Sequence, residues 1–144
     1  MALSAEDRLA VYELLSRYIY VIDGDRNEEK FFDLFTDDAV FEGPSGRFGG
    51  HAEIQNWLSS SSSRRIAGYR HLTSNIFVDG DGNEAELHAT FTTVITAFDG
   101  NDVDTNPSHT RLYQAGSYDC EARKVDGVWR LSKRTVKVFD ELLK

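Results

Sequence analysis

The first sixth of the chain places apolar residues at helical spacing. Leu9, Tyr12, Leu15, Ile19 and Ile22 recur three or four positions apart, which predicts one face of an amphipathic helix. Ser4, with Asp7 three residues later, is typical of a helix N-terminus. Gly24 predicts the C-terminal end of the same helix.

Two shorter segments with helical spacing follow. We expect helices at about Asn27–Phe35 and His51–Leu58, with a short strand, Ala39–Glu42, between them. The turn residues Gly43 to Gly46 close that strand. The serine run from Ser59 to Ser63 is too short for a linker between domains, and we expect a loop there.

From His71 onward the pattern changes from helical to alternating, which is typical of strands. The turn signals Asp79–Gly82 and Asp126–Gly127 predict two tight hairpins. A polar segment, Asn101–Ser108, predicts a longer loop. The strands predicted by this pattern are His71–Val78, Glu84–Phe98, Arg111–Arg123 and Val128–Phe139.

Helices first and strands afterwards indicate an α+β fold with the helices on one face of an antiparallel sheet. A long sheet twists and curls, so we expect a cone-shaped barrel of curved antiparallel sheet wrapped around the N-terminal helices and enclosing a pocket. The chain has 144 residues, no internal repeat and no compositional break, and we expect one domain over residues 1–144.

Composition and charge exclude several classes of function. The formal net charge is −8, and the densest basic stretches are dipeptides, so the chain lacks the basic patch that nucleic-acid binding requires. No apolar run approaches the roughly 20 residues of a membrane span. The chain has one cysteine, Cys120, and no visible signal peptide, which together favour a cytoplasmic protein.

Asp23 and His71 are the first candidates for chemistry. Asp23 is expected at the C-terminal end of the first helix, where the helix dipole disfavours a carboxylate, so another interaction must favour it there. A carboxylate bonded to one imidazole nitrogen fixes the tautomer and raises the basicity of the other nitrogen. An aspartate and a histidine that meet in a pocket would therefore form a general base.

Other residues are expected to line the same pocket. Tyr18 lies a little over one helical turn before Asp23, and Asn75 and Phe77 share the face of His71 in a regular strand. Trp57 is expected in the pocket wall. Arg134 is expected either to bind a substrate carbonyl or carboxylate or to pair with a buried acid such as Asp23.

A metal site made of Asp23, His71 and His88 is chemically conceivable, but the spacing of these residues does not require one. The glycines between Gly43 and Gly50 are not followed by the lysine of a phosphate-binding loop. We therefore expect no metal and no cofactor.

Four segments resemble the SnoaL-like group of the nuclear-transport-factor-2-like superfamily: Tyr18–Asp23, Leu34–Val40, Arg70–Asn75 and Asp126–Arg134. Within the group, the chain is similar to the branch of bile acid 7α-dehydratase, hexachlorocyclohexane dehydrochlorinase and scytalone dehydratase. The resemblance implies a cofactor-free lyase in a cone-shaped α+β barrel. It also implies an Asp–His dyad at Asp23 and His71.

The resemblance further implies roles for two other residues. The active-site tyrosine of the bile acid enzyme falls on Tyr18, and an arginine of the dehydrochlorinase falls on Arg134. The dehydrochlorinase has a lysine near the position of Tyr18, so its particular reaction is not implied. The second pair of active-site polar groups of these lyases has no counterpart that we identify in this sequence.

The function expected from these residues is a cofactor-independent acid–base lyase, a dehydratase that acts on a hydrophobic cyclic small molecule. His71 would remove the proton, with Asp23 and Tyr18 as the other catalytic residues and Asn75, Arg134, Trp57 and Phe77 as substrate-binding residues. The alternatives are an isomerase or polyketide-type cyclase with the same dyad, and a non-catalytic small subunit like those of ring-hydroxylating oxygenases. The resemblance also implies a homodimer or homotrimer, and the mildly polar outward positions Thr90, Thr92, Val94 and Thr96 would suit such an interface.

Overall fold

The computed structural model describes residues 1–24, 26–60, 69–95, 97–98, 102–103 and 110–139. It begins with α1 (Ala5–Asp23). The predicted N-terminal cap is confirmed, because the Ser4 hydroxyl accepts a hydrogen bond from the backbone N–H of Asp7 at 3.0 Å. Gly24 is the C-terminal cap, as predicted, and its N–H donates to the carbonyl of Val21.

The buried face of α1 is shifted from the predicted stripe. Leu9 is 58% exposed and Tyr12 is 42% exposed, so the prediction for these two residues is wrong. Of the predicted residues, Leu15, Ile19 and Ile22 are buried, and their immediate neighbours Leu14, Tyr18 and Val21 are buried as well. Its buried members are Val11, Leu14, Leu15, Tyr18, Ile19, Val21 and Ile22.

Two shorter helices flank the first strands. The second helix, α2 (Glu28–Phe32), is shorter than predicted, because the chain enters β1 (Phe35–Gly43) at the residue where the helix was expected to end. A turn leads into β2 (Gly46–Gly49), which was not predicted. The third helix, α3 (Gly50–Ser59), follows directly and agrees with the predicted segment to within one residue at each end.

The remaining chain forms the main part of the sheet. Its strands are β3 (Arg70–Asp81), β4 (Glu84–Ile95), β7 (Arg111–Val125) and β8 (Val128–Val138), with a small separate pair formed by β5 (Ala97–Phe98) and β6 (Asp102–Val103). Both predicted hairpins are present, between β3 and β4 and between β7 and β8. Residues 61–63 of the first predicted loop, and residues 101 and 104–108 of the second, lie outside the described residues. Within the second predicted loop, residues 102–103 form β6.

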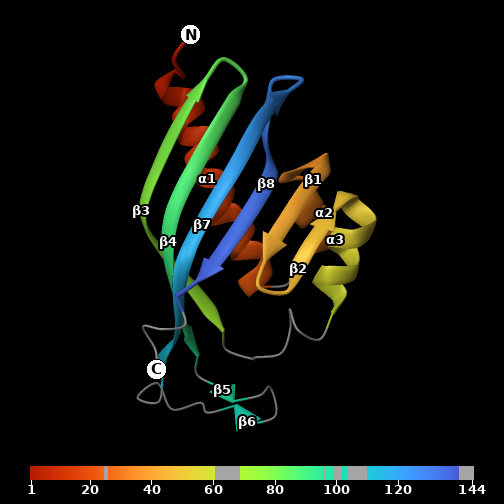
Figure 1. The fold of residues 1–144 in the computed structure, drawn as a ribbon, viewed down its shortest axis with the longest axis vertical. Helices are drawn as coiled ribbons and strands as arrows, with labels where there is room; N and C mark the ends of the chain where they lie inside the picture. Colours follow the sequence, from red (N-terminus) through yellow and green to blue (C-terminus); the bar gives the residue numbers. More distant parts are fainter. Residues whose placement is uncertain (25, 61–68, 96, 99–101, 104–109, 140–144) are drawn as a thin grey trace.

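The six-stranded sheet has the order β2-β1-β8-β7-β4-β3. All its pairings are antiparallel except that of β1 with β8, which is parallel. The sheet is curved and remains open, with β2 and β3 as its edges, while α1 lies across one face and α2 and α3 lie beside β1 and β2 (Figure 1). The predicted α+β class is therefore confirmed, with one parallel pairing that the alternating pattern did not reveal.

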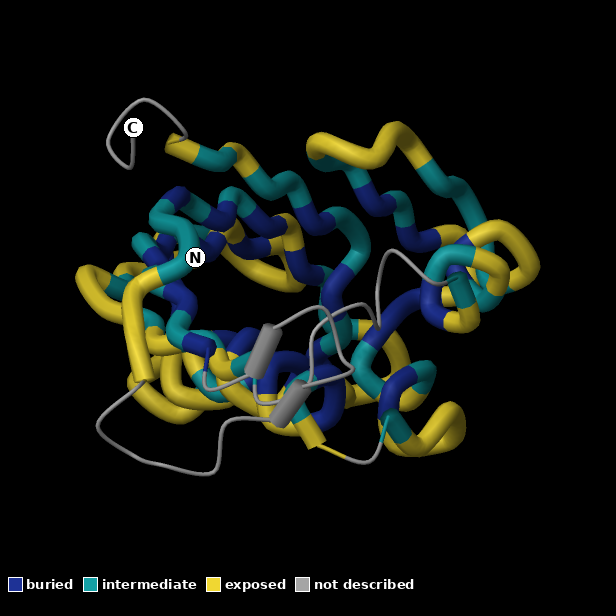
Figure 2. The backbone as a smooth tube through the Cα atoms, turned by 90° about the horizontal axis from the view of Figure 1, so that it is seen from below, coloured by how far each residue is buried: buried dark blue, intermediate teal, exposed yellow. Residues whose placement is uncertain are grey.

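The core lies between α1 and the sheet. Figure 2 shows the buried segments of the helix and of the strands on the sides that face one another. Tyr18, Phe31, Phe35, Phe41 and Tyr118 are among the largest fully buried side chains. Their rings form edge and tilted contacts with centroids 5.0 to 6.4 Å apart, a favourable aromatic geometry. Among the described residues, no helix is long and apolar enough to cross a membrane.

Candidate active site

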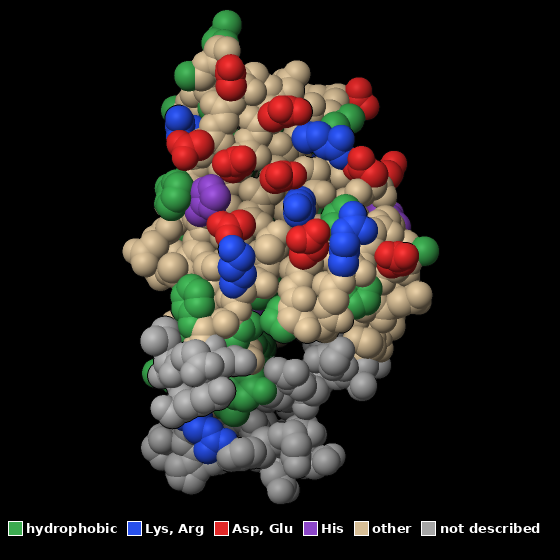
Figure 3. Space-filling model, in the orientation of Figure 1, with side chains coloured by type: hydrophobic (Ala, Val, Ile, Leu, Met, Phe, Trp, Pro, Cys, Tyr) green, Lys and Arg blue, Asp and Glu red, His purple; other side chains and the backbone are tan. Residues whose placement is uncertain are grey.

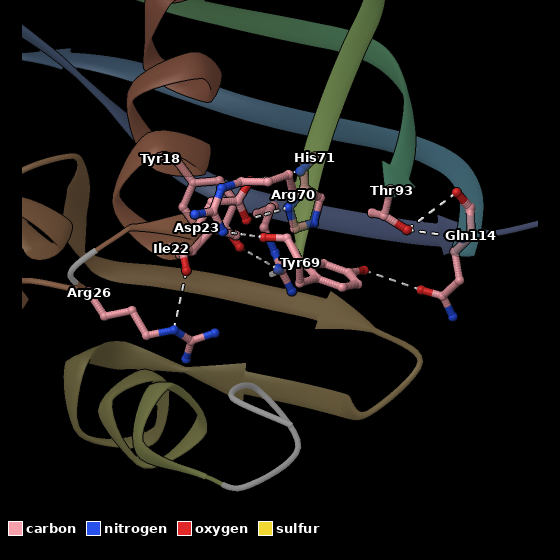
Figure 4. Close-up of polar contacts among 10 residues, drawn as sticks. Tyr18, Ile22, Asp23, Arg26, Tyr69, Arg70, His71, Thr93 and Gln114 are labelled. Atoms are coloured by element: carbon pink, nitrogen blue, oxygen red, sulfur yellow. Dashed lines mark hydrogen bonds and ion pairs between the residues drawn. The ribbon is translucent and has the colours of Figure 1, made fainter. Parts of the chain in front are cut away.

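Asp23 and His71 meet at the end of α1 and the start of β3. One carboxylate oxygen of Asp23 lies 2.7 Å from Nδ1 of His71, and the other accepts a 2.7 Å hydrogen bond from the backbone N–H of His71 (Figure 4). Each side chain is 10% exposed. The carboxylate thus holds both the ring and the backbone of His71, and the sequence-based prediction that these two residues come together is confirmed.

These contacts explain why an aspartate ends the helix. A carboxylate at a helix C-terminus is unfavourable beside the helix dipole. Here it accepts two hydrogen bonds from a residue 48 positions away, and such bonds to a charged acceptor are strong. The tertiary contact therefore offsets the unfavourable local position.

The arrangement assigns the proton positions of the imidazole. An ionised carboxylate only accepts hydrogen bonds, so Nδ1 of His71 carries a proton and donates it to Asp23. In the neutral ring, Nε2 is then the acceptor. Within the described part of the chain, Nε2 has no hydrogen-bond partner, and it is available to take a proton from a bound molecule.

Aromatic rings surround His71. The ring centroids of Tyr69, Phe91 and Tyr118 lie 5.0, 5.9 and 6.3 Å from that of the imidazole. Tyr69 also donates a long 3.5 Å hydrogen bond to Gln114, whose backbone N–H donates to Thr93 on the neighbouring strand (Figure 4). An apolar wall of this kind suits a hydrophobic ligand.

Tyr18 lies deeper in the core than Asp23. It is 0% exposed, and its ring is packed among Phe31, Phe35 and Phe41. Its hydroxyl accepts a 2.7 Å hydrogen bond from Nη1 of Arg134. Burial raises the pKa of Tyr18, and the neighbouring Arg134 opposes that rise, so the phenol is protonated at neutral pH.

Arg134 is a buried cation without a carboxylate partner among the described residues. Its guanidinium lies 4.2 Å from the ring centroid of Phe41 and 5.1 Å from that of Trp57, and the residue is 6% exposed. Its Nε has no hydrogen-bond partner in the described structure. The expected alternative, that Arg134 pairs with Asp23, is wrong, because its polar partner is the hydroxyl of Tyr18.

Trp57 is half-buried and contacts this group from α3. Its ring centroid lies 5.2 Å from that of Phe41. The structure thus brings Trp57, Arg134 and Tyr18 together on one side of the core, while Asp23 and His71 lie at the end of α1. Tyr118 connects the two groups, because its ring contacts both Tyr18 and His71.

Asn75 and Phe77 do not share the face of His71. A bulge between Ser74 and Phe77 adds one residue to β3, and Asn75 has a left-handed backbone conformation with φ of 53°. Because an extra residue reverses the faces of all later positions, Phe77 points outward, is 55% exposed and stacks on His88. The expectation that Asn75 and Phe77 line the site is therefore not met by their positions.

The same geometry removes the metal alternative built on His88. This residue lies on the outer face, where its Nδ1 is 2.5 Å from Asp119, and it is separated by the sheet from Asp23 and His71. The part of the chain that the structure describes contains no group of three His, Cys, Asp or Glu side chains placed to hold a metal ion. Asp23 is thus bonded to His71 and not placed beside His88.

Phe91 was not predicted from the sequence, and for Tyr118 the sequence indicated only that at most one of Tyr113 and Tyr118, on opposite faces of a regular strand, lines the pocket. Tyr118, Cys120 and Ala122 alternate along β7 and are all buried, so an inward face could have been recognised there. Tyr69 precedes the predicted strand and lacked any such pattern. A second bulge lies in β7, where Tyr113 is one extra residue opposite Thr93 and Val94 of β4. The ring centroid of Tyr113 lies 5.7 Å from that of Tyr69.

A groove of about 410 Å³ lies elsewhere, at the end of the sheet near the β3–β4 hairpin. Acidic side chains gather on that part of the outer face (Figure 3). It is lined by Asp79, Gly80, Asp81, Glu84, Ala85, Glu86, Glu121, Ala122, Arg123 and Ser132, none of which is a predicted site residue. A pocket at Asp23 and His71 stays a prediction.

Comparison with known families agrees with this fold. The model of the SnoaL-like domain matches residues 3–135, which is most of the chain. The chain belongs to the SnoaL-like family. The search of curated proteins found no match.

Solved structures with the SnoaL-like fold of this chain include three informative neighbours. A protein of unknown function with a cystatin-like fold from Nostoc punctiforme is 25% identical, with 96% of this chain and 95% of that chain covered and a TM-score of 0.78. A hexachlorocyclohexane dehydrochlorinase, LinA-type3, from Novosphingobium barchaimii is 20% identical, with 91% of this chain and 85% of that chain covered and a TM-score of 0.74. A protein provisionally assigned as a scytalone dehydratase from Novosphingobium aromaticivorans is 22% identical, with 90% of this chain and 82% of that chain covered and a TM-score of 0.70.

Proposed function

We propose that this protein is a cofactor-independent acid–base lyase that dehydrates a hydrophobic, cyclic hydroxy-carbonyl compound. The observation that carries the proposal is the pair formed by Asp23 and His71, in which Nδ1 is bound by the carboxylate and Nε2 has no partner among the described residues. The named lyases among the structural neighbours are consistent with it.

In the proposed reaction, Nε2 of His71 removes a proton from the carbon next to a carbonyl group. The C–H electron pair moves toward the carbonyl oxygen, which becomes an enolate oxygen. As the carbonyl re-forms, the carbon–oxygen bond of the β-hydroxyl group breaks, and the His71 imidazolium returns its proton to the departing oxygen. The products are an unsaturated carbonyl compound and water, and the protein is unchanged.

Asp23 orients the imidazole throughout this sequence and stabilises the imidazolium with its negative charge, at 2.7 Å from Nδ1. The Tyr18 hydroxyl donates a hydrogen bond to one of the substrate oxygens. Arg134 acts through Tyr18: it donates to the phenolic oxygen and thereby makes the phenol a stronger hydrogen-bond donor. Trp57 contributes to the aromatic wall that holds Arg134.

The test measures proton removal from the substrate by deuterium exchange. The protein is incubated in deuterium oxide with a panel of cyclic β-hydroxy ketones and hydroxy-sterols, and NMR measures both deuterium incorporation beside the carbonyl and alkene formation. We expect His71→Gln and Asp23→Asn to lower the rate by about 10²- to 10⁴-fold, the usual contribution of general acid–base catalysis.

A matched control is available on the other side of the sheet. His88 also bonds a carboxylate, that of Asp119, but on the outer face. His88→Gln should leave the rate unchanged. Unchanged rates in the His71→Gln and Asp23→Asn variants would refute the proposal, and deuterium incorporation without alkene would assign an isomerase or cyclase in place of a dehydratase.

A further inference from the structure

Tyr118 is a buried tyrosine whose hydroxyl takes part in none of the hydrogen bonds among the described residues. The residue is 2% exposed, and its hydroxyl has no hydrogen-bond partner among the described residues. Phenylalanine would fill the same volume, so packing alone does not require the hydroxyl. A ligand that accepts a hydrogen bond would account for a tyrosine at this position.

Tyr118 lies between His71 and Tyr18 and contacts both. Its strand, β7, faces α1 across the core, and its ring centroid lies 6.4 Å from that of Tyr18 and 6.3 Å from that of His71. Phe91 holds the ring from the neighbouring strand with a centroid distance of 4.9 Å. Burial raises the pKa of Tyr118 well above its ordinary value, so the phenol keeps its proton and is available as a donor.

The proposed dehydration requires donors for two different oxygens. The carbonyl oxygen gains negative charge as the proton leaves, and the hydroxyl oxygen departs with an electron pair. The carbon that loses its proton to His71 is bonded directly to the carbonyl carbon, so the donor to the carbonyl oxygen must lie close to His71. The ring of Tyr118 contacts the imidazole, whereas the ring of Tyr18 contacts Tyr118 and the phenylalanines and its hydroxyl is bonded to Arg134.

We propose that Tyr118 is a further catalytic residue, which donates a hydrogen bond to the carbonyl oxygen of the substrate, while Tyr18 donates to the departing hydroxyl oxygen. This inference depends on the proposed function and narrows it to β-hydroxy carbonyl compounds. A substrate without a carbonyl oxygen, such as a haloalkane, leaves Tyr118 unpaired. The two phenols therefore specify a substrate with two oxygens.

The first experiment uses 4-nitrophenol as a probe, because its ionised oxygen resembles an enolate oxygen and its absorbance reports ionisation. We expect Tyr118→Phe to weaken binding of 4-nitrophenolate about ten- to hundredfold, the loss typical of one hydrogen bond to a charged group. The matched control is Tyr20→Phe, the same chemical change on an exposed face of α1, where Tyr20 is 82% exposed. The control should bind the probe as the unmodified protein does.

Stability measurements separate this role from a structural one. Because the hydroxyl has no partner in the described structure, Tyr118→Phe should leave the melting temperature unchanged or higher. Equal probe affinity in Tyr118→Phe and Tyr20→Phe would overturn the inference, as would failure of the unmodified protein to bind the probe.

The deuterium experiment then distinguishes the two proposals. If the rate falls in His71→Gln but not in Tyr118→Phe, the dehydratase proposal stands and the role of Tyr118 is wrong. If Tyr118→Phe weakens probe binding while His71→Gln keeps full activity, Tyr118 is confirmed as a hydrogen-bond donor to a bound oxygen. The proposal that His71 is the general base is then wrong. With both proposals correct, Tyr118→Phe lowers kcat and kcat/KM together, because the hydrogen bond strengthens in the transition state.

Discussion

Arg134 and Tyr18 lie 116 positions apart in the sequence, and a 2.7 Å hydrogen bond joins the guanidinium of one to the hydroxyl of the other. Both side chains are buried. The described structure provides no carboxylate for the cation, only the phenol and the faces of Phe41 and Trp57. Such an arrangement is costly for the fold, and we interpret Arg134 as a positioning residue that acts through Tyr18.

The first prediction separates stability from activity at this pair. Arg134→Met removes a buried charge but also leaves the buried Tyr18 hydroxyl without its donor, so the two effects oppose each other and the free energy of unfolding should change by no more than about 1–3 kcal/mol. Activity should fall roughly ten- to hundredfold, the loss expected for one hydrogen bond to a charged group. Urea unfolding and the NMR assay measure the two effects.

A double-mutant cycle with Tyr18→Phe tests the connection. If Arg134 acts through Tyr18, the double variant should be no slower than Tyr18→Phe alone. If the activity loss of the double variant equals the product of the two single losses, Arg134 contributes independently of Tyr18. A large loss of stability in Arg134→Met would contradict the interpretation.

The second prediction concerns pH. Asp7 in the first turn of α1 accepts hydrogen bonds from Trp129 at 2.8 Å and Lys124 at 2.9 Å, and these contacts lower the pKa of Asp7 from 3.8 to about 2. A lowered folded-state pKa adds stability above the unfolded value, and that stability is lost as pH falls from about 4 to about 2. The Asp7→Asn variant should therefore show a weaker decline in urea midpoint across this range. Parallel curves for the two proteins would contradict the assignment.

The third prediction concerns the cysteine. Cys120 is 2% exposed, and burial raises the pKa of its thiol to about 12. Because the thiolate is the reactive form, the folded protein should not react with Ellman's reagent at pH 8. One thiol per chain should react after unfolding in guanidinium chloride. Rapid reaction of the folded protein would mean that β7 opens more readily than its packing indicates.

The fourth prediction tests the wall beside His71. A Cβ atom on Gly116 would lie 2.1 Å from the backbone oxygen of Lys137 and 2.7 Å from the ring of Phe91, which packs against Tyr118 and His71. Gly116→Ala should therefore destabilise the fold by about 1–3 kcal/mol and lower activity, although Gly116 touches no reacting atom. The control is Gly43→Ala, where the nearest atom would be at an ordinary 3.6 Å. Equal stability of the two variants in thermal unfolding would show that both the Lys137 backbone and the Phe91 ring can move aside at no cost.

The fifth prediction concerns assembly. Leu72, Phe77 and Leu112 are 57%, 55% and 65% exposed on the outer face of the sheet. Covering such side chains would bury apolar area, and we expect a homodimer or homotrimer. Light scattering at micromolar concentration measures this, and a monomer alone would contradict it. Leu72→Lys together with Leu112→Lys should shift the protein toward smaller species.

The local sequence determined much of the fold and the central pair of the site. The Ser4 cap, the Gly24 stop and the two hairpin turns are set by short-range hydrogen bonds and backbone preferences, so they could be predicted from neighbouring residues. Asp23 stood out by its position at a helix end, and its pairing with His71 was implied by the resemblance to the SnoaL-like group. Their meeting follows once α1 packs on the sheet.

Only the tertiary structure decided the rest of the site. The bulge at Asn75 depends on how β3 pairs with β4, and one added residue moves Phe77 to the outer face. The parallel pairing of β1 with β8 and the bond from Arg134 to Tyr18 join distant segments, and no local pattern encodes them. Tyr118 was identified by the absence of a hydrogen bond within the described structure, which becomes visible only when all its neighbours are in place.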